Sequence, residues 1–481
     1  MNIALQKQHC RNTSDTVKWL EFSRIQLSVF VPAWNEPMKR KIFFFTIASL
    51  LFGFTVFIPY WTGVEAEKQF RLLNQHVPTH DAQMILSNTT YQRGWLISQA
   101  QSTFEIARGV ISAESQQVIL EHKIEHGFLP ILPTIIYTSI APQSRIVHWL
   151  GLTETPVLVK TTLQLDGSGN SQIHILSLSL NDPERHAKLQ LQRIEGSATF
   201  TANLAQLNGE LRLPQLQLET DKGKVQVNNT TFTTNLRAHS GGIWLGMNQW
   251  QMDEVSLLSQ TLPAVVLRQL KVSVDNQLID KHLQVNLKSQ LQQLAVKQDN
   301  YGPGDITMEI RHLNVDSVNH VRQILNTMSN LPSARSNILL LGKLTQHGMA
   351  LLNEQPELAI PQLNFAAPQG QLTGNLLLGV DKIDATAWFY PMKLLDSLHG
   401  KLVMQLPTSL LNQILSTIAQ PDISDSSQTA EGTQLAQTWL ANWLKRGLIT
   451  QQDQTYHVQA QLQNGMLDLN GRQIMLKNLW R

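Results

Sequence analysis

Apolar and polar residues alternate along most of the chain from about residue 82 onward. A clear example is 158–178, where Leu163 and Leu165 precede the turn sequence Asp-Gly-Ser-Gly-Asn and Ile173 and Ile175 follow it. A period of two places the apolar side chains on one face of a strand, and a glycine-rich turn between two such runs is typical of a hairpin. The pattern therefore predicts an antiparallel sheet with one covered, apolar face.

The phase of this alternation slips by one residue after Ile175, because the next apolar positions are Leu176, Leu178 and Leu180. A slip of one residue is what a β-bulge leaves in a sequence. Period-two alternation recurs in six further stretches: 186–194, 197–218, 224–239, 267–274, 283–289 and 305–315. The sequence therefore predicts many strands joined by short turns.

Two segments, 211–227 and 358–374, share a Pro-Gln-Leu sequence followed by a glycine. The spacing from Pro214 to Gly223 equals the spacing from Pro361 to Gly370. Two interpretations remain open. Either two hairpins use the same turn chemistry, or a β-unit is duplicated and the sheet has two similar lobes.

A few stretches show helical spacing instead. Asp316 is expected to cap a helix over 316–330, which places Val318, Val321, Ile324 and Leu325 on one face. Further helices are predicted at 63–77, ending before Pro78, at 407–420, and at 432–447, with a loop over 421–432 and a closing hairpin at 457–474 that turns at Asn464-Gly465. The fold class expected is mainly β with a few helices (α+β).

Residues 42–60 form an uncharged apolar stretch that follows Lys39-Arg40-Lys41 and is followed by Trp61. At about 1.5 Å per residue, a helix of this length nearly crosses a hydrocarbon core of roughly 30 Å. A basic flank places its own side in the cytoplasm, and aromatic residues mark the opposite interface. The stretch is predicted to be an uncleaved signal anchor. A cleaved signal peptide and a buried core helix are the alternatives.

Composition narrows the function classes. The net charge is +2 and the charged residues amount to 15% of the chain, so the concentrated basic surface of a nucleic-acid-binding protein is not expected. Cys10 is the one cysteine, which excludes an internal disulfide and a cysteine-based metal cluster. No cofactor is implied.

Motifs for catalysis are missing: the chain has no GxSxG, HExxH, P-loop or GxGxxG sequence. His122 and His126 have the i, i+4 spacing of helical metal ligands, but their segment alternates like a strand. On a strand they would lie about 13 Å apart, too far to share one ion.

Two aromatic motifs leave alternatives open. In Tyr91-Gln92-Arg93-Gly94-Trp95, Arg93 could bind a phosphate or carboxylate, whereas the structural interpretation makes Gly94 a turn or bulge and the aromatic rings a cover for the sheet. Trp439 and Trp443, with Leu435, form a stripe on the last helix that faces either the core or a ligand or membrane.

Three short motifs carry a family resemblance: YQRGWLISQ at 91–99, IEHGFLPI at 124–131 and NGMLDLNGRQI at 464–474. With the order of basic flank, anchor, Gln-rich β region and late helices, they resemble the YdgA-like family of bacterial inner-membrane proteins from about Met38 to the end. The signature positions are Tyr91, Arg93, Gly94, His126 and Gly127, whose role the family does not establish. Where the family typically has HGPFP, this chain has HGFLP.

The sequence and the resemblance together predict four regions: an extension at 1–37 that stems from an upstream start codon, the basic flank and anchor at 38–61, a periplasmic β-rich region at 62–315, and a periplasmic α+β region at 316–481. The resemblance implies an inner membrane of a Gram-negative cell, crossed once, with the N-terminus cytoplasmic. The function expected is a non-enzymatic role in envelope structure or transport. A lipid- or hydrophobe-binding module with an apolar β-groove and an enzyme with a site around Arg93 and His126 are the alternatives. Expected partners are the membrane, a lipid or a second copy of the chain.

Overall fold

The computed structural model describes eleven stretches of the chain, excepting residues 65, 69 and 146 within them: 63–71, 84–106, 116–127, 132–147, 157–182, 186–239, 243–260, 263–330, 334–383, 391–418 and 428–476. Two compact units divide the chain, Met1–Phe57 and Ile58–Arg481, and all described residues belong to the second. The predicted extension (1–37) and anchor (42–60) lie outside the described residues. Within the described stretches, no helix has both the length and the apolar character needed to cross a bilayer.

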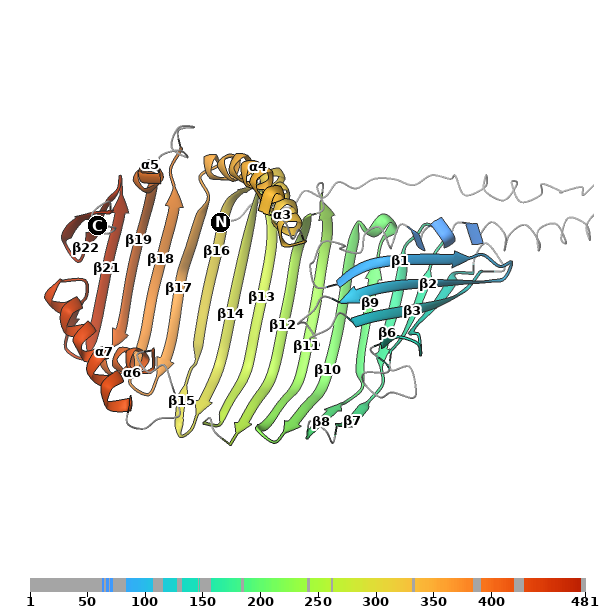
Figure 1. Ribbon diagram of the computed structural model, residues 1–481, viewed down its shortest axis with the longest axis horizontal. Coiled ribbons are helices and arrows are strands. Elements are labelled where there is room, and N and C mark those ends of the chain that lie inside the picture. The colour runs from blue at the N-terminus through green and yellow to red at the C-terminus, as the bar shows by residue number, and fades with distance from the viewer. Residues whose placement is uncertain are drawn as a thin grey trace, which may run out of the picture. The chain divides into compact units, whose positions relative to one another are not determined.

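In the described part of the chain, 23 strands form one antiparallel sheet (Figure 1). The strands of its first half are β1 (Met84–Gln92), β2 (Ile97–Ile106), β3 (Gln116–Glu125), β4 (Thr134–Ile140), β5 (Val157–Leu163), β6 (Gly169–Ile175), β7 (Leu178–Asp182), β8 (Ala187–Leu191), β9 (Ile194–Phe200), β10 (Gln206–Thr220) and β11 (Gly223–His239). Those of its second half are β12 (Ile243–Ser259), β13 (Val265–Ile279), β14 (His282–Val296), β15 (Asp299–Tyr301), β16 (Gly304–Asn314), β17 (Glu357–Ala367), β18 (Gly370–Val380), β19 (Leu398–Pro407), β20 (Thr450–Gln452), β21 (Thr455–Gln463), β22 (Met466–Leu469) and β23 (Arg472–Met475).

Pairing follows the chain order almost throughout. Strands β1 to β6 pair in sequence, β6 pairs with β9, and β10 pairs with both β9 and β8. From β10 to β14 each strand again pairs with the next, and the ladder continues through β16, β17, β18, β19, β21, β22 and β23. The predicted antiparallel sheet is therefore confirmed, and its described strands form one continuous ladder.

The predicted bulge after Ile175 corresponds to a break between β6 and β7. The neighbouring strand is broken at the matching place, between β8 and β9, so that β10 pairs with β9 along Leu207–Arg212 and with β8 along Leu216–Thr220. The irregularity is thus shared by adjacent strands, because a change of phase in one strand must be matched by its partner to keep the apolar side chains on one face.

The two Pro-Gln-Leu segments form similar hairpins. Each has a two-residue turn, closed by the pairs Thr220–Gly223 and Ala367–Gly370, and both glycines have positive φ angles (151° and 130°). A Cβ atom on Gly223 would lie 2.2 Å from the carbonyl oxygen of Leu258. The shared glycine is therefore explained by turn chemistry.

The helices are α3 (Val315–Asn330), α4 (Ala334–Asn353), α5 (Pro391–Asp396), α6 (Thr408–Ile418) and α7 (Gln428–Lys445), with a short 3-10 helix at Ala202–Leu204 and helical residues within 63–71. The predicted cap of α3 is wrong: the side chain of Asn314, not Asp316, accepts the hydrogen bond of the Ser317 amide, at 2.9 Å. Neither α4 nor α5 was predicted, and α4 carries a run of apolar residues at 338–341 that fits no single face.

Helix α7 begins four residues earlier than predicted, and its buried face differs from the predicted stripe. Ala436 and Leu440 are buried, and Trp443 packs against them, whereas Leu435 and Trp439 are exposed. Of the two interpretations of the tryptophan stripe, the core interpretation is therefore confirmed for Trp443 and wrong for Trp439. Ala436, Leu440 and Trp443 lie in the core because this face of α7 packs on α6.

The strand register separates an apolar face from a polar one. Cross-strand partners share a face, and one such row contains Leu211, Phe232, Trp250 and Val272 of β10 to β13. The adjacent row on the other face contains Arg212, Thr231, Gln251 and Lys271. The predicted division into an apolar and a polar face is confirmed.

Helices cover this apolar face at both ends of the sheet. Near the first strands, Ala66 and Phe70 pack against Ala100, Ile124 and Ile136. Near the last strands, α6 and α7 form a buried cluster with β19 and β21, which includes Leu415, Ala436, Leu440, Leu406 and Tyr456. Along one margin, Val315 at the start of α3 packs with Ile243 and Leu283.

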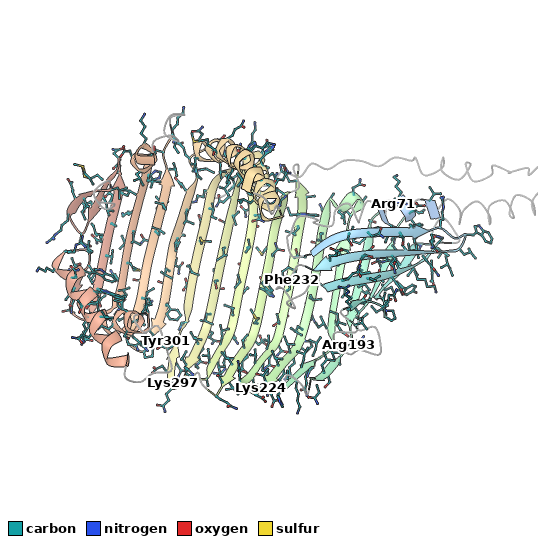
Figure 2. The ribbon with its side chains drawn as sticks, in the orientation of Figure 1. Arg71, Arg193, Lys224, Phe232, Lys297 and Tyr301 are labelled. Atoms are coloured by element: carbon teal, nitrogen blue, oxygen red, sulfur yellow. The ribbon has the colours of Figure 1, made fainter. Side chains whose placement is uncertain are left out.

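Between these covers, no helix of the described residues packs on the apolar face. We call this part, on β10 to β14, the open apolar region; it comprises Leu211, Leu213, Phe232, Trp250, Met252, Leu270, Val272, Leu287 and Leu291. All of these side chains are half-buried except Trp250, which is 53% exposed, and Phe232 marks the place in Figure 2. The expectation of a covered face is thus wrong for the longest strands.

Candidate functional site

The five signature positions lie together at the beginning of the sheet. Tyr91 and Gln92 are the last two residues of β1, and Arg93 and Gly94 follow them in the turn to β2. His126 and Gly127 come directly after β3. Strand β2 brings them together because it pairs with β1 on one side and with β3 on the other. The amide of His126 continues this pairing by donating to the carbonyl oxygen of Leu96 at 2.8 Å.

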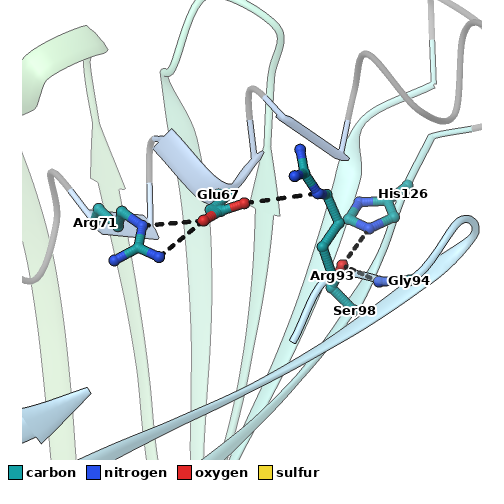
Figure 3. Close-up of polar contacts among 6 residues, drawn as sticks. All are labelled: Glu67, Arg71, Arg93, Gly94, Ser98 and His126. Carbon is teal, nitrogen blue, oxygen red and sulfur yellow. Dashed lines mark hydrogen bonds and ion pairs between the residues drawn. The ribbon is translucent and has the colours of Figure 1, made fainter. Parts of the chain in front are cut away.

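Ser98 connects these positions, and it was not singled out from the sequence. Its hydroxyl accepts a hydrogen bond from the Gly94 amide at 3.1 Å and lies 2.7 Å from Nε2 of His126 (Figure 3). Ser98 is fully buried. Ser98 lies inside the YQRGWLISQ motif, and membership of that motif was the one indication in the sequence that it matters. Nothing in the motif distinguishes it from its exposed neighbours.

Both signature glycines lie where a side chain has no space. A Cβ atom on Gly94 would lie 2.0 Å from the carbonyl oxygen of Ile97, and one on Gly127 would lie 2.1 Å from that of Leu132. Contacts that short do not occur between these atom types, so any other residue would shift the backbone. The interpretation of Gly94 as a turn residue agrees with its place between β1 and β2.

Arg93 connects the turn to the helical residues 63–71. Its Nε lies 3.8 Å from Oε2 of Glu67, and Arg71 is 2.8 Å from Oε1 of the same carboxylate (Figure 3). The anion that Arg93 faces here is therefore a carboxylate of its own chain. Exposed ion pairs of this kind contribute about 0–1 kcal/mol to stability. The segment is also held by the ring of Phe70, whose centre lies 5.7 Å from that of Tyr91 and 4.9 Å from that of His122. We expect this aromatic packing to contribute more to the stability of the segment than the ion pairs do.

The polar groups under this segment are uncharged at neutral pH. Burial lowers the pKa of His122 to about 4, and its two ring nitrogens lie 2.8 Å from the Thr138 hydroxyl and 3.1 Å from the Ser102 hydroxyl. Burial also lowers the pKa of His126, and it raises the pKa of Tyr91, partly offset by the Ser98 hydroxyl. The strand conformation predicted around the two histidines is confirmed, and each bonds to a different serine.

The contact between Ser98 and His126 has the distance of a nucleophile and its general base. Two features oppose that chemistry. Ser98 has no exposed surface that a substrate could reach, and Nδ1 of His126 is buried without a hydrogen-bond partner among the described residues, so nothing orients the ring as a base. The pair is better explained as a structural link between the β1–β2 turn and the end of β3.

Replacing Ser98 with alanine is expected to lower the free energy of unfolding by about 1–3 kcal/mol, because the Gly94 amide and the His126 ring both lose their partner inside the protein. Thermal unfolding of the purified chain measures the effect. Replacement of the exposed neighbour Gln99 with alanine is the control and should change little. Equal unfolding temperatures for the two variants would contradict the structural role of Ser98.

The fold and this site define a β-rich protein with an apolar sheet face and a buried polar link at its first strands. The chain belongs to the family described as bacterial protein of unknown function (DUF945), whose pattern matches residues 38–477. It is similar to Protein YdgA of Escherichia coli (strain K12), with 20% identity over 438 residues that cover 83% of this chain and 86% of that protein. No solved structure matches the chain. The resemblance to the YdgA-like family is confirmed.

Proposed function

We propose that this chain is a non-enzymatic envelope protein that binds lipid acyl chains on its open apolar region. The observation that carries the proposal is the half-exposed apolar surface of β10 to β14, with Trp250 near its centre. Soluble proteins rarely leave contiguous apolar patches of more than a few hundred Å² exposed unless they bind something there. Each Å² of such surface removed from water gives about 25 cal/mol, which favours a hydrocarbon ligand over water on this face.

Acyl chains suit this surface better than a second rigid sheet does. Helices cover the apolar face at both ends, through Phe70 on the first strands and through α6 and α7 on the last. A helix has a diameter of about 10 Å, which is also the distance at which two sheets pack. A second sheet as wide as this one would therefore collide with these helices before it could pack on the strands between them, whereas flexible chains can follow the surface.

The chain order supports a place beside a bilayer. The predicted anchor ends at Tyr60, and the helical residues that cover the first strands begin at 63. In this proposal the anchor crosses the inner membrane once, with the N-terminus in the cytoplasm and the sheet in the periplasm. A role in envelope structure or transport would then follow from holding lipid outside the bilayer.

A photoreactive amino acid placed at Trp250 of the full-length chain tests this proposal in living cells. Illumination is expected to give lipid adducts at position 250, identified by mass spectrometry of the purified protein. The matched control is Gln251, the next residue of β12, which lies on the polar face. At least tenfold fewer lipid adducts are expected there.

Two results would count against lipid binding. Equal adduct yields at positions 250 and 251 would mean that the reagent only reports general contact with membranes. A covalent dimer in place of lipid adducts at position 250 would show that a second copy covers this surface.

A further inference from the structure

Five large apolar side chains are exposed at one end of the first strands. Trp95, Leu96 and Ile97 lie in the turn after β1 and at the start of β2, Leu132 lies two residues before β4, and Val64 belongs to the helical residues 63–71. Each of the five is between 37% and 49% exposed. We call these five residues the apolar tip, which is separate from the open apolar region of β10 to β14.

Contacts around His126 bring the three segments of the tip together. The His126 amide donates to the carbonyl oxygen of Leu96 at 2.8 Å. A Cβ atom on Gly127 would lie 2.1 Å from the carbonyl oxygen of Leu132, and one on Gly63 would lie 3.3 Å from Nε2 of His126. The β1–β2 turn, the residues before β4 and the start of the helical segment therefore all lie against the two residues that follow β3.

The buried polar link described above holds the tip from beneath. The hydroxyl of Ser98 bonds to the Gly94 amide, one residue before the tip turn, and to His126 (Figure 3). The turn residues 95–97 are therefore fixed at both of their ends, while their side chains remain exposed. Single exposed apolar residues are common on soluble proteins, whereas a fixed cluster that includes a tryptophan marks a contact surface.

The start of the described chain identifies what the tip contacts. In the proposed function the anchor ends at Tyr60, and Trp61 is the aromatic residue at the far interface of the bilayer. Gly63, which lies against His126, follows Trp61 by two residues. An extended chain spans at most about 3.6 Å per residue, so Gly63 lies within about 7 Å of the interfacial residue. The apolar tip is thereby held at the membrane surface.

We infer that the apolar tip inserts into the interface of the bilayer that the anchor crosses, beside the end of the anchor. The inference rests on the membrane placement in the proposed function and adds a second attachment of the sheet to the membrane. The ring of Trp95 suits the headgroup level, and the aliphatic side chains of Leu96 and Leu132 suit the acyl boundary beneath it. Two attachments hold the first strands in one orientation, whereas an anchor alone leaves them free to turn.

Quenching of a fluorophore by nitroxide-bearing lipid tests the insertion. The full-length chain, with Cys10→Ser and one new cysteine that carries the fluorophore NBD, is reconstituted into phosphatidylcholine liposomes with and without nitroxide-bearing phosphatidylcholine. Labels introduced by Leu96→Cys and by Leu132→Cys should lose as much emission as NBD attached to a lipid headgroup in the same liposomes.

Two exposed positions outside the tip are the controls. Glu105 lies eight residues after Ile97 on β2, about 26 Å away at 3.3 Å per residue. Met466 is an exposed apolar residue in β22 of the closing hairpin. Labels introduced by Glu105→Cys and by Met466→Cys should lose little or no emission.

Matched substitutions show whether the apolar side chains cause the insertion. Trp95→Ser combined with Leu96→Ser should reduce the quenching of the label at position 132, because the remaining tip has less apolar surface to place in the membrane. Met466→Ser combined with Met475→Ser removes two exposed apolar residues that pair in the closing hairpin, and it should leave that quenching unchanged. The label measurements on the chain without these substitutions test the inference by themselves, whatever the serine variants do to folding.

The outcomes separate this inference from the proposed function. If the chain stays in the liposomes after washing with alkaline carbonate but the labels at positions 96 and 132 escape quenching, the tip does not insert, and lipid binding by the open apolar region is unaffected. Equal quenching at positions 96, 105 and 466 would also overturn the inference, because the contact would not be specific to the tip. Release of the chain by carbonate would remove the anchor and the inserted tip together, whereas adducts at position 250 test the open apolar region separately.

Discussion

Alanine in place of Gly94 is expected to lower the free energy of unfolding by about 3 kcal/mol or more. Its methyl group would lie 2.0 Å from the backbone oxygen of Ile97, so the turn between β1 and β2 must open. Opening that turn would also break the hydrogen bond from the Gly94 amide to Ser98. Chemical denaturation of the purified chain measures the change.

Gly342 provides the matched control. It lies inside α4, and no atom stands within 4 Å of the place that its Cβ would occupy. Alanine there should stabilise the chain by about 0.5–1 kcal/mol, because it restricts the unfolded backbone and favours the helix. If Gly94→Ala were as stable as Gly342→Ala, the close contact at Gly94 would not exist in the folded protein.

Acidification from pH 6.5 to pH 4 is expected to cost up to about 3 kcal/mol of stability through His122. In the unfolded chain its pKa returns to about 6.5, whereas burial holds the folded pKa at about 4. Between these values the unfolded state binds one proton more than the folded state, so the free energy of unfolding rises with pH. The contribution is complete above pH 6.5 and is lost as the pH falls toward 4.

The variant His122→Gln isolates this effect. Glutamine retains hydrogen-bonding groups for Ser102 and Thr138 but does not titrate. Free energies of unfolding measured at several pH values should show a shallower decline for the variant than for the natural chain between pH 6.5 and 4. Parallel curves would mean that His122 is not buried in its neutral form.

Local patterns in the sequence were enough to predict many of the strands, several turns and the division of the sheet into two faces, although β12 was missed. The hairpin around Asp166 to Asn170, the break after Ile175 and the Asn464-Gly465 turn were all found in this way, and all are present. Period and turn chemistry depend on residues that are near each other in the chain, so sequence alone reveals them.

The site was predictable only in part. The resemblance identified Tyr91, Arg93, Gly94, His126 and Gly127, and the structure places them side by side. Ser98, which connects Gly94 to His126, was missed because its role depends on β2 lying between β1 and β3. A buried serine and an exposed one have the same appearance in a strand pattern.

The sequence by itself determined that this chain forms an antiparallel sheet with one apolar face, but it did not identify β12, which carries Trp250. Only the tertiary structure decided where the face is covered: residues 63–71 and the helices α6 and α7 cover its two ends, and among the described residues no helix covers the middle, where Trp250 is exposed. The physical reason is that alternation records which way a side chain points. Whether another segment packs on it depends on residues far away in the chain, so burial cannot be read from the strand alone.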